Sequence, residues 1–270
     1  MKLLLVTGTH PRHLYVNKEL LKHFEEVLVI ILESEEILPA TPKVASTEDQ
    51  HLFKLHFSKR LENELQFFGD LCAEKIFEHQ NKIYVKRDDL NSARISQIVS
   101  DWSADFAFIF GSPIIKEPLI GILPKFSINL HLGLSPWFRG SATLFWPFYL
   151  LMPQYAGVTF HYICHEVDAG PIVHQSVPTL EYGDSLHSVA CKCVMSAAID
   201  INDLVKFWKQ HACLPSISQT ANGKLWMLKD FMPSHLRIIY DLYDDQMVDK
   251  YLNKQLPNNI PKLIKLGNRD

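Results

Sequence analysis

Two polar side chains on one expected strand could act on the same reacting atom. Asn129 and His131 stand two residues apart in an apolar run over residues 127–132. Side chains of a strand alternate between its two faces, so these two point to the same side. An amide donates hydrogen bonds, and an imidazole takes up and releases protons near neutral pH. Taken alone, the pair is more typical of a histidine with a structural asparagine on an edge strand.

A carboxylate further along the chain could complete this pair. Asp168 follows another expected strand, over residues 156–164. Open α/β proteins build their sites at the carboxyl edge of the sheet, where residues from several strands meet. An amide, an imidazole and a carboxylate could therefore converge there, and together they would suit proton transfer with stabilisation of a developing negative charge.

The turn after the first apolar run offers a second candidate site. Residues 8–13 read Gly-Thr-His-Pro-Arg-His and place backbone amides at the start of a helix, where the helix dipole favours an anion. We expect His10 and Arg12 to contact a substrate phosphate, although a solvated turn with a proline at the helix entry is equally consistent. The turn matches neither the GxGxxG nor the Walker A pattern, which disfavours a dinucleotide oxidoreductase and an NTPase.

A metal site is not expected. His161 and His165 stand four apart, as two ligands on one helical face would. The surrounding residues 157–164 alternate like a strand, however, and Glu166 is not part of an HExxH motif. The odd number of cysteines, without a repeated CxxC spacing, predicts buried reduced thiols rather than a disulfide framework; they are Cys72, Cys164, Cys191, Cys193 and Cys213.

The elements that must position these residues predict an α/β fold with a mainly parallel sheet. Buried parallel strands read as continuous apolar runs, and such runs cover residues 2–7, 27–32, 105–111, 127–132, 156–164 and 171–177. Helical spacing covers residues 15–24, Thr47–Phe68, 92–102, 141–151 and 185–211. Composition changes near residue 215, where a short strand at 224–228 precedes a helix through 236–243. We therefore expect a catalytic domain over residues 1–214 and a small C-terminal appendage over residues 215–270.

Composition excludes several classes of protein. The 270 residues are 47% hydrophobic and 21% charged, as in ordinary globular proteins. A net charge of −3 gives no general attraction for a phosphate backbone, so a nucleic-acid partner is not expected. The longest nearly uncharged stretch, residues 137–162, is interrupted by arginine, glycine and proline, and the first apolar run is too short for a signal peptide. We expect a cytoplasmic protein with no membrane partner.

Four motifs in one order resemble the folate-dependent formyltransferase family. They are Asn129-x-His131, Leu134-x-Pro136-x-x-Arg139-Gly140, Gly157-Val-Thr-x-His161 and Asp168-x-Gly170-x-Ile172. The resemblance covers roughly residues 1–205 and is densest from 105 to 175. The family includes glycinamide ribonucleotide formyltransferase, methionyl-tRNA formyltransferase and the nucleotide-sugar N-formyltransferases.

This resemblance implies a Rossmann-like formyltransferase core and N10-formyltetrahydrofolate as co-substrate, with no metal. It carries the catalytic trio onto Asn129, His131 and Asp168. Asn129 would stabilise the oxyanion formed when an amine attacks the formyl carbon, His131 would move protons, and Asp168 would orient His131. The residues that would line the pterin pocket are Ser112, Pro113, Ile114, Ile115, His165, Glu166 and Val167.

The acceptor is expected to be a nucleotide-linked amino sugar. The tRNA enzymes carry a larger C-terminal barrel domain, the glycinamide ribonucleotide enzymes have a glycine-rich loop where this chain has residues 10–13, and residues 140–146 look most like the sugar enzymes. Trp137 joins His10 and Arg12 as an expected substrate contact. Methionyl-tRNA or another amine remains an alternative acceptor. Two alternative functions also remain: a catalytically silent folate- or nucleotide-binding protein, and a hydrolase that deformylates the folate. A homodimer is compatible with the sequence, which does not determine the oligomeric state.

Overall fold

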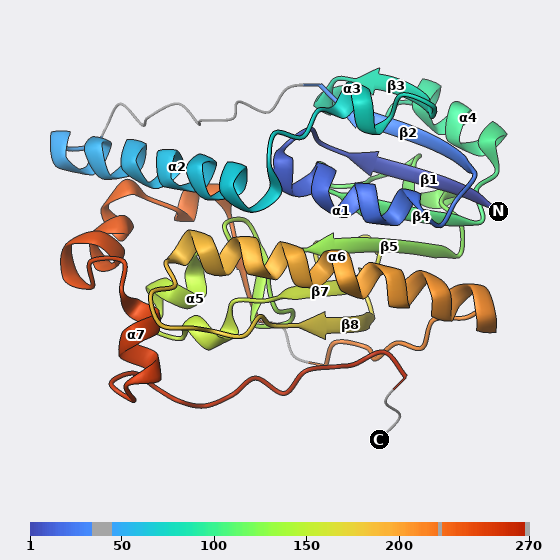
Figure 1. Cartoon of the computed structure of the whole chain (residues 1–270). Coiled ribbons are helices and arrows are strands. Elements are labelled where there is room, and N and C mark those ends of the chain that lie inside the picture. The colour runs from blue at the N-terminus through green and yellow to red at the C-terminus, as the bar shows by residue number, and fades with distance from the viewer. Residues whose placement is uncertain (34–44, 221–222, 268–270) are drawn as a thin grey trace.

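A seven-stranded sheet forms the centre of the computed structural model, which describes residues 1–33, 45–220 and 223–267 (Figure 1). The strand order is β3-β2-β1-β4-β5-β7-β8; the first five strands are parallel, whereas β7 is antiparallel to both β5 and β8. Their bounds are β1 Lys2–Thr7, β2 Glu26–Leu32, β3 Asn81–Val85, β4 Phe106–Phe110, β5 Phe126–His131, β7 Val158–Tyr162 and β8 Ile172–Ser176. The expected α/β class with a mainly parallel sheet is confirmed.

Helices cover both faces of this sheet because its parallel strands are apolar on both sides. Leu4 and Val6 of β1 belong to the core under α4, whereas Leu3 and Leu5 belong to the core under α1 and α6. Figure 1 shows α1 and α6, which contact each other, across the same face. The helices are α1 Pro11–Leu21, α2 Thr47–Phe68, α3 Ala73–Ile76, α4 Ala93–Trp102, α5 Trp146–Tyr149, α6 Leu186–His211 and α7 Met247–Leu252. No helix among the described residues has the length and apolar character needed to cross a membrane.

Serine side chains cap the N-termini of three helices, α2, α4 and α6. The hydroxyl oxygen of Ser46 accepts a hydrogen bond from the Asp49 amide at 3.1 Å, and that of Ser185 accepts one from the Ser188 amide at the same distance. Ser92 caps α4 in the same way. Each cap satisfies an amide that the first helical turn leaves without a partner. These starts agree with the bounds expected from the sequence.

Two expected helices are much shorter in the structure. Residues 141–151 contain only α5, because Ala142 and Leu151 have positive φ angles of 55° and 60° that interrupt a right-handed helix. The helix expected through residues 236–243 is a short 3₁₀ turn, Pro233–Leu236, followed by one π-helical turn, Ile238–Leu242. The strand β3 and the short helices α3 and α7 were not expected from the sequence. Of the cysteines, all of them free, Cys191 and Cys193 are buried as expected, but Cys213 is exposed.

The C-terminal segment packs on the main core. Its strand β9, Lys224–Trp226, pairs with β6, Phe138–Gly140, in a separate two-stranded sheet. Trp226 stacks on Trp146 of α5, with ring centroids 3.9 Å apart and planes 14° apart. Further along, Leu236, Ile239, Met247 and Val248 are buried in the same core cluster as the sheet. The division of the chain into residues 1–214 and an appendage over residues 215–270 stays a prediction. Part of that appendage lies outside the described ranges.

This packing predicts that the C-terminal segment unfolds together with the core. Replacing Trp226, whose side chain lies against Trp146, with alanine should lower the free energy of unfolding by about 3–5 kcal/mol. Chemical denaturation followed by tryptophan fluorescence and by circular dichroism measures the change. Leu228→Ala is the matched control, because Leu228 is 76% exposed and its loss should cost less than about 0.5 kcal/mol. Two separate transitions, or a Trp226→Ala change below about 1 kcal/mol, would contradict the single core.

Candidate active site

Strands β5 and β7 bring two of the expected residues and a third polar side chain together. Asn129 and His131 lie on β5, and the antiparallel register of β5 and β7 sets His161 directly opposite Asn129. Directly opposite residues of an antiparallel pair have adjacent side chains. The amide nitrogen of Asn129 donates a hydrogen bond to Nε2 of His161 at 3.1 Å. His161 was not expected to act in catalysis, although its place in the motif Gly157-Val-Thr-x-His161 was the available signal.

Asp168 lies between the two histidines. Its Oδ2 is 3.4 Å from Nδ1 of His131, and its Oδ1 is 3.4 Å from Nε2 of His161. The backbone amide of Gly140 donates to Oδ2 at 2.9 Å, and the amide nitrogen of Asn129 is 3.5 Å from Oδ1. The structure thus brings Asn129, His131 and Asp168 together, as expected, with His161 as a fourth member.

The neighbouring carbonyl groups determine which nitrogen of each histidine carries a proton. Nε2 of His131 lies 2.8 Å from the Phe138 carbonyl oxygen, and Nδ1 of His161 lies 2.8 Å from the Tyr162 carbonyl oxygen. A carbonyl only accepts, so these two nitrogens are the donors. In neutral His131 the basic nitrogen is therefore Nδ1, which faces Asp168. A proton taken up at Nδ1 would form an ion pair with that carboxylate.

Burial and charge act in opposite directions on these groups. Burial holds the pKa of His131 below its usual value, because the loss of solvent disfavours the imidazolium. The nearby Asp168 carboxylate favours the imidazolium but does not outweigh this effect. Burial would raise the pKa of Asp168, but the two histidines and the Gly140 amide outweigh it and keep that pKa below its usual range. At neutral pH the site therefore pairs a neutral imidazole with a carboxylate, as general acid–base chemistry requires.

These side chains line a cleft of about 660 Å³, a size typical of small-molecule sites. The residues expected in a pterin pocket mostly line it as well: Ser112, Pro113, Ile114, Ile115, Glu166 and Val167. His165 does not fit that expectation. Its side chain is 77% exposed and lies near Glu117, because the turn that follows β7 carries it away from the cleft. Among the described residues no group of three or more potential ligands is arranged to hold a metal ion.

Two residues that the sequence analysis did not assign hold the loops of this cleft. The side chain of Asn91 donates to the Ile114 carbonyl at 3.0 Å and accepts from the Lys116 amide at 2.7 Å, which fixes the loop after β4. Arg139, only 3% exposed, donates from Nε and Nη2 to the Val167 carbonyl at 3.0 and 2.8 Å. Its Nη2 also donates to Glu166 at 2.8 Å. Arg139 therefore fixes the loop that leads into Asp168.

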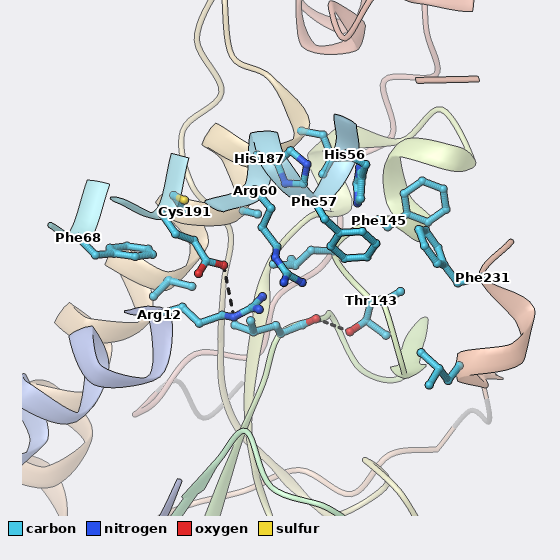
Figure 2. Close-up of a pocket in the computed structure, with 18 residues that line it drawn as sticks. Arg12, His56, Phe57, Arg60, Phe68, Thr143, Phe145, His187, Cys191 and Phe231 are labelled. Carbon is cyan, nitrogen blue, oxygen red and sulfur yellow. Dashed lines mark hydrogen bonds and ion pairs between the residues drawn. The ribbon is translucent and has the colours of Figure 1, made fainter. Parts of the chain in front are cut away.

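A second cavity of about 340 Å³ adjoins the cleft (Figure 2). Arg12, Leu132, Ala142, Thr143 and Leu228 line both spaces. Figure 2 shows the guanidinium groups of Arg12 and Arg60 turned into the same space, with Phe57 beside them. The other walls are largely apolar and come from α2, α5, α6 and the C-terminal segment; they include Phe68, Phe145, Val194 and Phe231.

The expected substrate contacts fall in different places. Arg12 lies at the junction of the two cavities, and its Nε is 3.4 Å from the buried carboxylate of Glu64. His10 lies outside both cavities: it precedes α1 and is 5% exposed, and His13, one turn on, lines the cleft instead. Trp137 also lies outside both cavities, because its ring packs edge-on against Tyr155. The structure therefore does not support His10 and Trp137 as substrate contacts.

Comparison with known proteins confirms the resemblance found in the sequence. The formyl transferase family model matches residues 71–197, just under half of the chain, from the segment before α3 into α6. Methionyl-tRNA formyltransferase from Bacteroides thetaiotaomicron is 25% identical over 96 residues, which are 36% of this chain and 30% of that protein. The chain thus matches less than a third of the length of this curated relative.

Solved structures share the fold. Phosphoribosylglycinamide formyltransferase from Anaplasma phagocytophilum is 21% identical with a TM-score of 0.54, and the match covers 84% of this chain and 98% of that one. WlaRD, a sugar 3N-formyltransferase crystallised with dTDP and 5-N-formyltetrahydrofolate, is 16% identical with a TM-score of 0.56 over 86% of this chain and 71% of that one. At these identities the comparison shows a common formyltransferase fold.

The position of Asp168 predicts a measurable change in His131. The carboxylate favours the imidazolium, so Asp168→Asn should lower the pKa of His131 still further and move its titration to lower pH. NMR titration of the imidazole resonances, with His131 identified by its loss in His131→Ala, measures this. Asp203→Asn is the matched control, since Asp203 is an exposed carboxylate on α6 that pairs with Lys206. An unchanged or higher His131 pKa in Asp168→Asn would contradict the arrangement.

Proposed function

We propose that this chain transfers a formyl group from N10-formyltetrahydrofolate to an amine. Its residues 71–197 match the formyl transferase family model, and it shares the fold of solved formyltransferases. The observation that carries the proposal is the Asp168 carboxylate between His131 and His161, beside the Asn129 amide, in a cleft that also contains the loop over residues 112–115. The residues of that loop line the cleft, and a backbone loop with apolar side chains suits a flat pterin with many donors and acceptors.

The folate, when bound, supplies the formyl carbon that a neutral amine attacks. Asn129 has two N–H groups: one donates to His161, and the other makes only the 3.5 Å contact with Asp168. This second N–H can turn to the formyl oxygen as that oxygen becomes negative. A hydrogen bond that strengthens in the transition state lowers the barrier rather than merely binding substrate.

Proton transfer falls to His131. Its Nδ1 is unprotonated in the neutral ring and can take the proton that the attacking amine loses. The Asp168 carboxylate, 3.4 Å away, then stabilises the imidazolium. The imidazolium can then give that proton to N10 of the folate as the bond between N10 and the formyl carbon breaks. The Phe138 carbonyl keeps the ring in this tautomer by accepting from Nε2. The 3.4 Å distance is longer than an ordinary hydrogen bond, but such contacts commonly tighten when substrate binds.

The acceptor we propose is an amino sugar linked to a nucleotide. The cleft and the second cavity meet at Arg12, so one extended molecule can place its amine near His131 and its other end in the second cavity. Arg12 and Arg60 suit a diphosphate, and Phe57, Phe145 and Phe231 suit a planar base. The sugar enzyme WlaRD, which shares the fold, was crystallised with dTDP. Methionyl-tRNA is the second candidate, because the matching curated relative is a methionyl-tRNA formyltransferase.

An activity assay tests the reaction and the acceptor separately. The purified chain is incubated with N10-formyltetrahydrofolate and, in turn, dTDP-, UDP- and GDP-linked amino sugars or methionyl-tRNA at matched salt. Mass spectrometry of the products should show a formylated sugar. Formylated methionyl-tRNA without any formylated sugar would contradict the proposed acceptor but would support the proposed formyl transfer. Release of formate with no acceptor present would indicate a hydrolase, and no consumption of the folate would contradict the enzymatic proposal altogether.

The catalytic trio predicts losses in kcat rather than in folate binding. His131→Ala should lower kcat about 10²–10⁴-fold because general acid–base groups commonly contribute that much. Asn129→Ala should lower kcat about 10²–10³-fold, as the loss of one oxyanion donor does. Steady-state kinetics and titration with 5-formyltetrahydrofolate separate the two effects. A normal kcat in either variant, or a change confined to KM, would refute the assigned role.

The loop after β4 predicts where the folate binds. Ile114 lines the cleft and is 49% exposed, so Ile114→Arg should fill the pterin pocket and abolish binding of 5-formyltetrahydrofolate. Ile199→Arg is the control, since Ile199 is 66% exposed on α6 and lies outside the cleft. Calorimetry measures both variants. Wild-type folate affinity in Ile114→Arg would show that the pterin binds elsewhere.

The junction of the two cavities predicts a selective loss of acceptor binding. Removing Arg12 alone would leave the buried Glu64 carboxylate without its ion pair, so the variant is Arg12→Met with Glu64→Gln. Loss of a charged hydrogen bond to a phosphate should raise KM for the nucleotide-linked substrate about 10–100-fold, with KM for the folate unchanged. Arg94→Ala, on the exposed face of α4, is the control. An equal rise in KM for both substrates would show that Arg12 has a structural role and does not bind the phosphate.

A further inference from the structure

Asp168 adopts a backbone conformation that side-chain-bearing residues rarely adopt. Its φ angle is +50°, in the left-handed region, although it is not a glycine. Such conformations persist only where the surrounding structure holds them, and they gather at functional sites. The contacts that hold the backbone of Asp168 therefore decide where its carboxylate lies.

One side chain from the C-terminal segment makes the shortest of these backbone contacts. Nε2 of Gln219 donates to the Asp168 carbonyl at 2.9 Å and to the Gly170 carbonyl at 2.8 Å. The Ser135 hydroxyl donates to the same Asp168 carbonyl at 3.3 Å. The Gln219 amide thus bridges both ends of the turn that carries the carboxylate.

The orientation of this amide is determined by its partners. Both contacted atoms are carbonyl oxygens, so the group facing them must be the NH₂. The reversed amide would place Oε1 against two acceptors. Oε1 is instead buried and has no hydrogen-bond partner among the residues that the structure describes. A buried oxygen without a partner costs free energy. The two hydrogen bonds that Gln219 donates therefore account for the position of its side chain.

The chain approaches the turn in a fixed register. Ile217 and Ile172 exchange two backbone hydrogen bonds of 2.8 Å, and Gln219 follows two residues later. Gly170 lies so close to β7 that an added Cβ would be 1.8 Å from the Tyr162 carbonyl oxygen. The turn therefore cannot shift toward β7, and the Gln219 amide holds it through the carbonyl groups of Asp168 and Gly170. Residue 219 lies outside the segment, 71–197, that matches the family model.

We infer that Gln219 is a positioning residue, which holds the left-handed turn at Asp168 and thereby sets the distance between its carboxylate and His131. Without the two donated bonds the 168–170 backbone can relax, and the carboxylate moves away from Nδ1 of His131. His131 then loses the charge that stabilises its imidazolium. The effect on turnover rests on the proposed formyl transfer, whereas the effect on His131 does not.

The test compares two replacements of Gln219. Gln219→Met keeps the length of the side chain but removes the donors, and Gln219→Lys keeps a donor that can reach the carbonyl groups. Gln97→Met is the matched control, because the Gln97 amide also donates a hydrogen bond, of 2.8 Å to Asp101, but on the exposed face of α4. NMR titration of His131, steady-state kinetics and thermal unfolding are measured for all three variants and the wild type.

We expect Gln219→Met to move the His131 titration to lower pH, in the direction of Asp168→Asn, and to lower kcat about 10–100-fold with KM for the folate unchanged, since small misplacements of reacting groups have losses of this order. Gln219→Lys should recover part of both, and Gln97→Met should change neither. A merely structural role would lower the melting temperature and leave the His131 titration in place.

The outcomes separate the two proposals. An unchanged His131 titration in folded Gln219→Met, whatever its activity, would overturn the positioning role. A shifted His131 titration in an enzyme whose wild type transfers no formyl group would support the positioning role and contradict the proposed function. If Gln219→Met fails to fold, Gln219→Ala, which also removes the donors, decides. A His131 titration moved to lower pH in folded Gln219→Ala supports the positioning role, and an unchanged titration in that variant contradicts it.

Discussion

The carboxylate of Asp168 is the interaction on which the rest of the site depends. One of its oxygens faces His131 and accepts from the Gly140 amide, and the other faces His161 and Asn129. Keeping a charge in so buried a place costs free energy unless partners satisfy it. These partners do so, and they hold the pKa of Asp168 below its usual range in spite of burial. Burial keeps His131 neutral, and the Asp168 carboxylate beside Nδ1 leaves it ready to accept a proton there.

The fold supplies this environment through a change of strand direction. The parallel strands β1 to β5 share one carboxyl edge, and the antiparallel strand β7 then sets His161 against Asn129 by register alone. Buried hydrogen bonds fix the loop between them: the Thr159 hydroxyl donates to the Gly133 carbonyl at 2.7 Å and accepts from the Ser135 amide at 3.0 Å. The protein thus places its polar groups by backbone geometry before any ligand binds, which is what electrostatic preorganisation requires.

Local sequence signals predicted the parts that depend on local physics. Apolar runs located the buried strands, and helical spacing located α2 and α6, because both signals are contained in a few neighbouring residues. The trio Asn129, His131 and Asp168 could be proposed from its motifs. The rest depends on contacts distant in sequence. No pattern near Gln219 shows that it lies against residues 168–170, and the packing that removes His10 and Trp137 from the cleft is visible only in three dimensions. The left-handed conformations at Ala142 and Leu151 likewise shortened a helix that apolar spacing had favoured.

The most direct test of the central claim, that the Asp168-centred cluster is where the formyl group is transferred, is a crystal structure of the chain with a stable folate analogue that carries its formyl group on N10. We expect the pterin against residues 112–115 and the formyl oxygen about 2.7–3.1 Å from the Asn129 amide nitrogen, the range of an oxyanion donor. His131 and Asp168 should keep their contact beside the formyl carbon. A folate bound elsewhere, or a formyl group held more than about 6 Å from Asn129 and His131, beyond the reach of a hydrogen bond even through one water, would contradict the account.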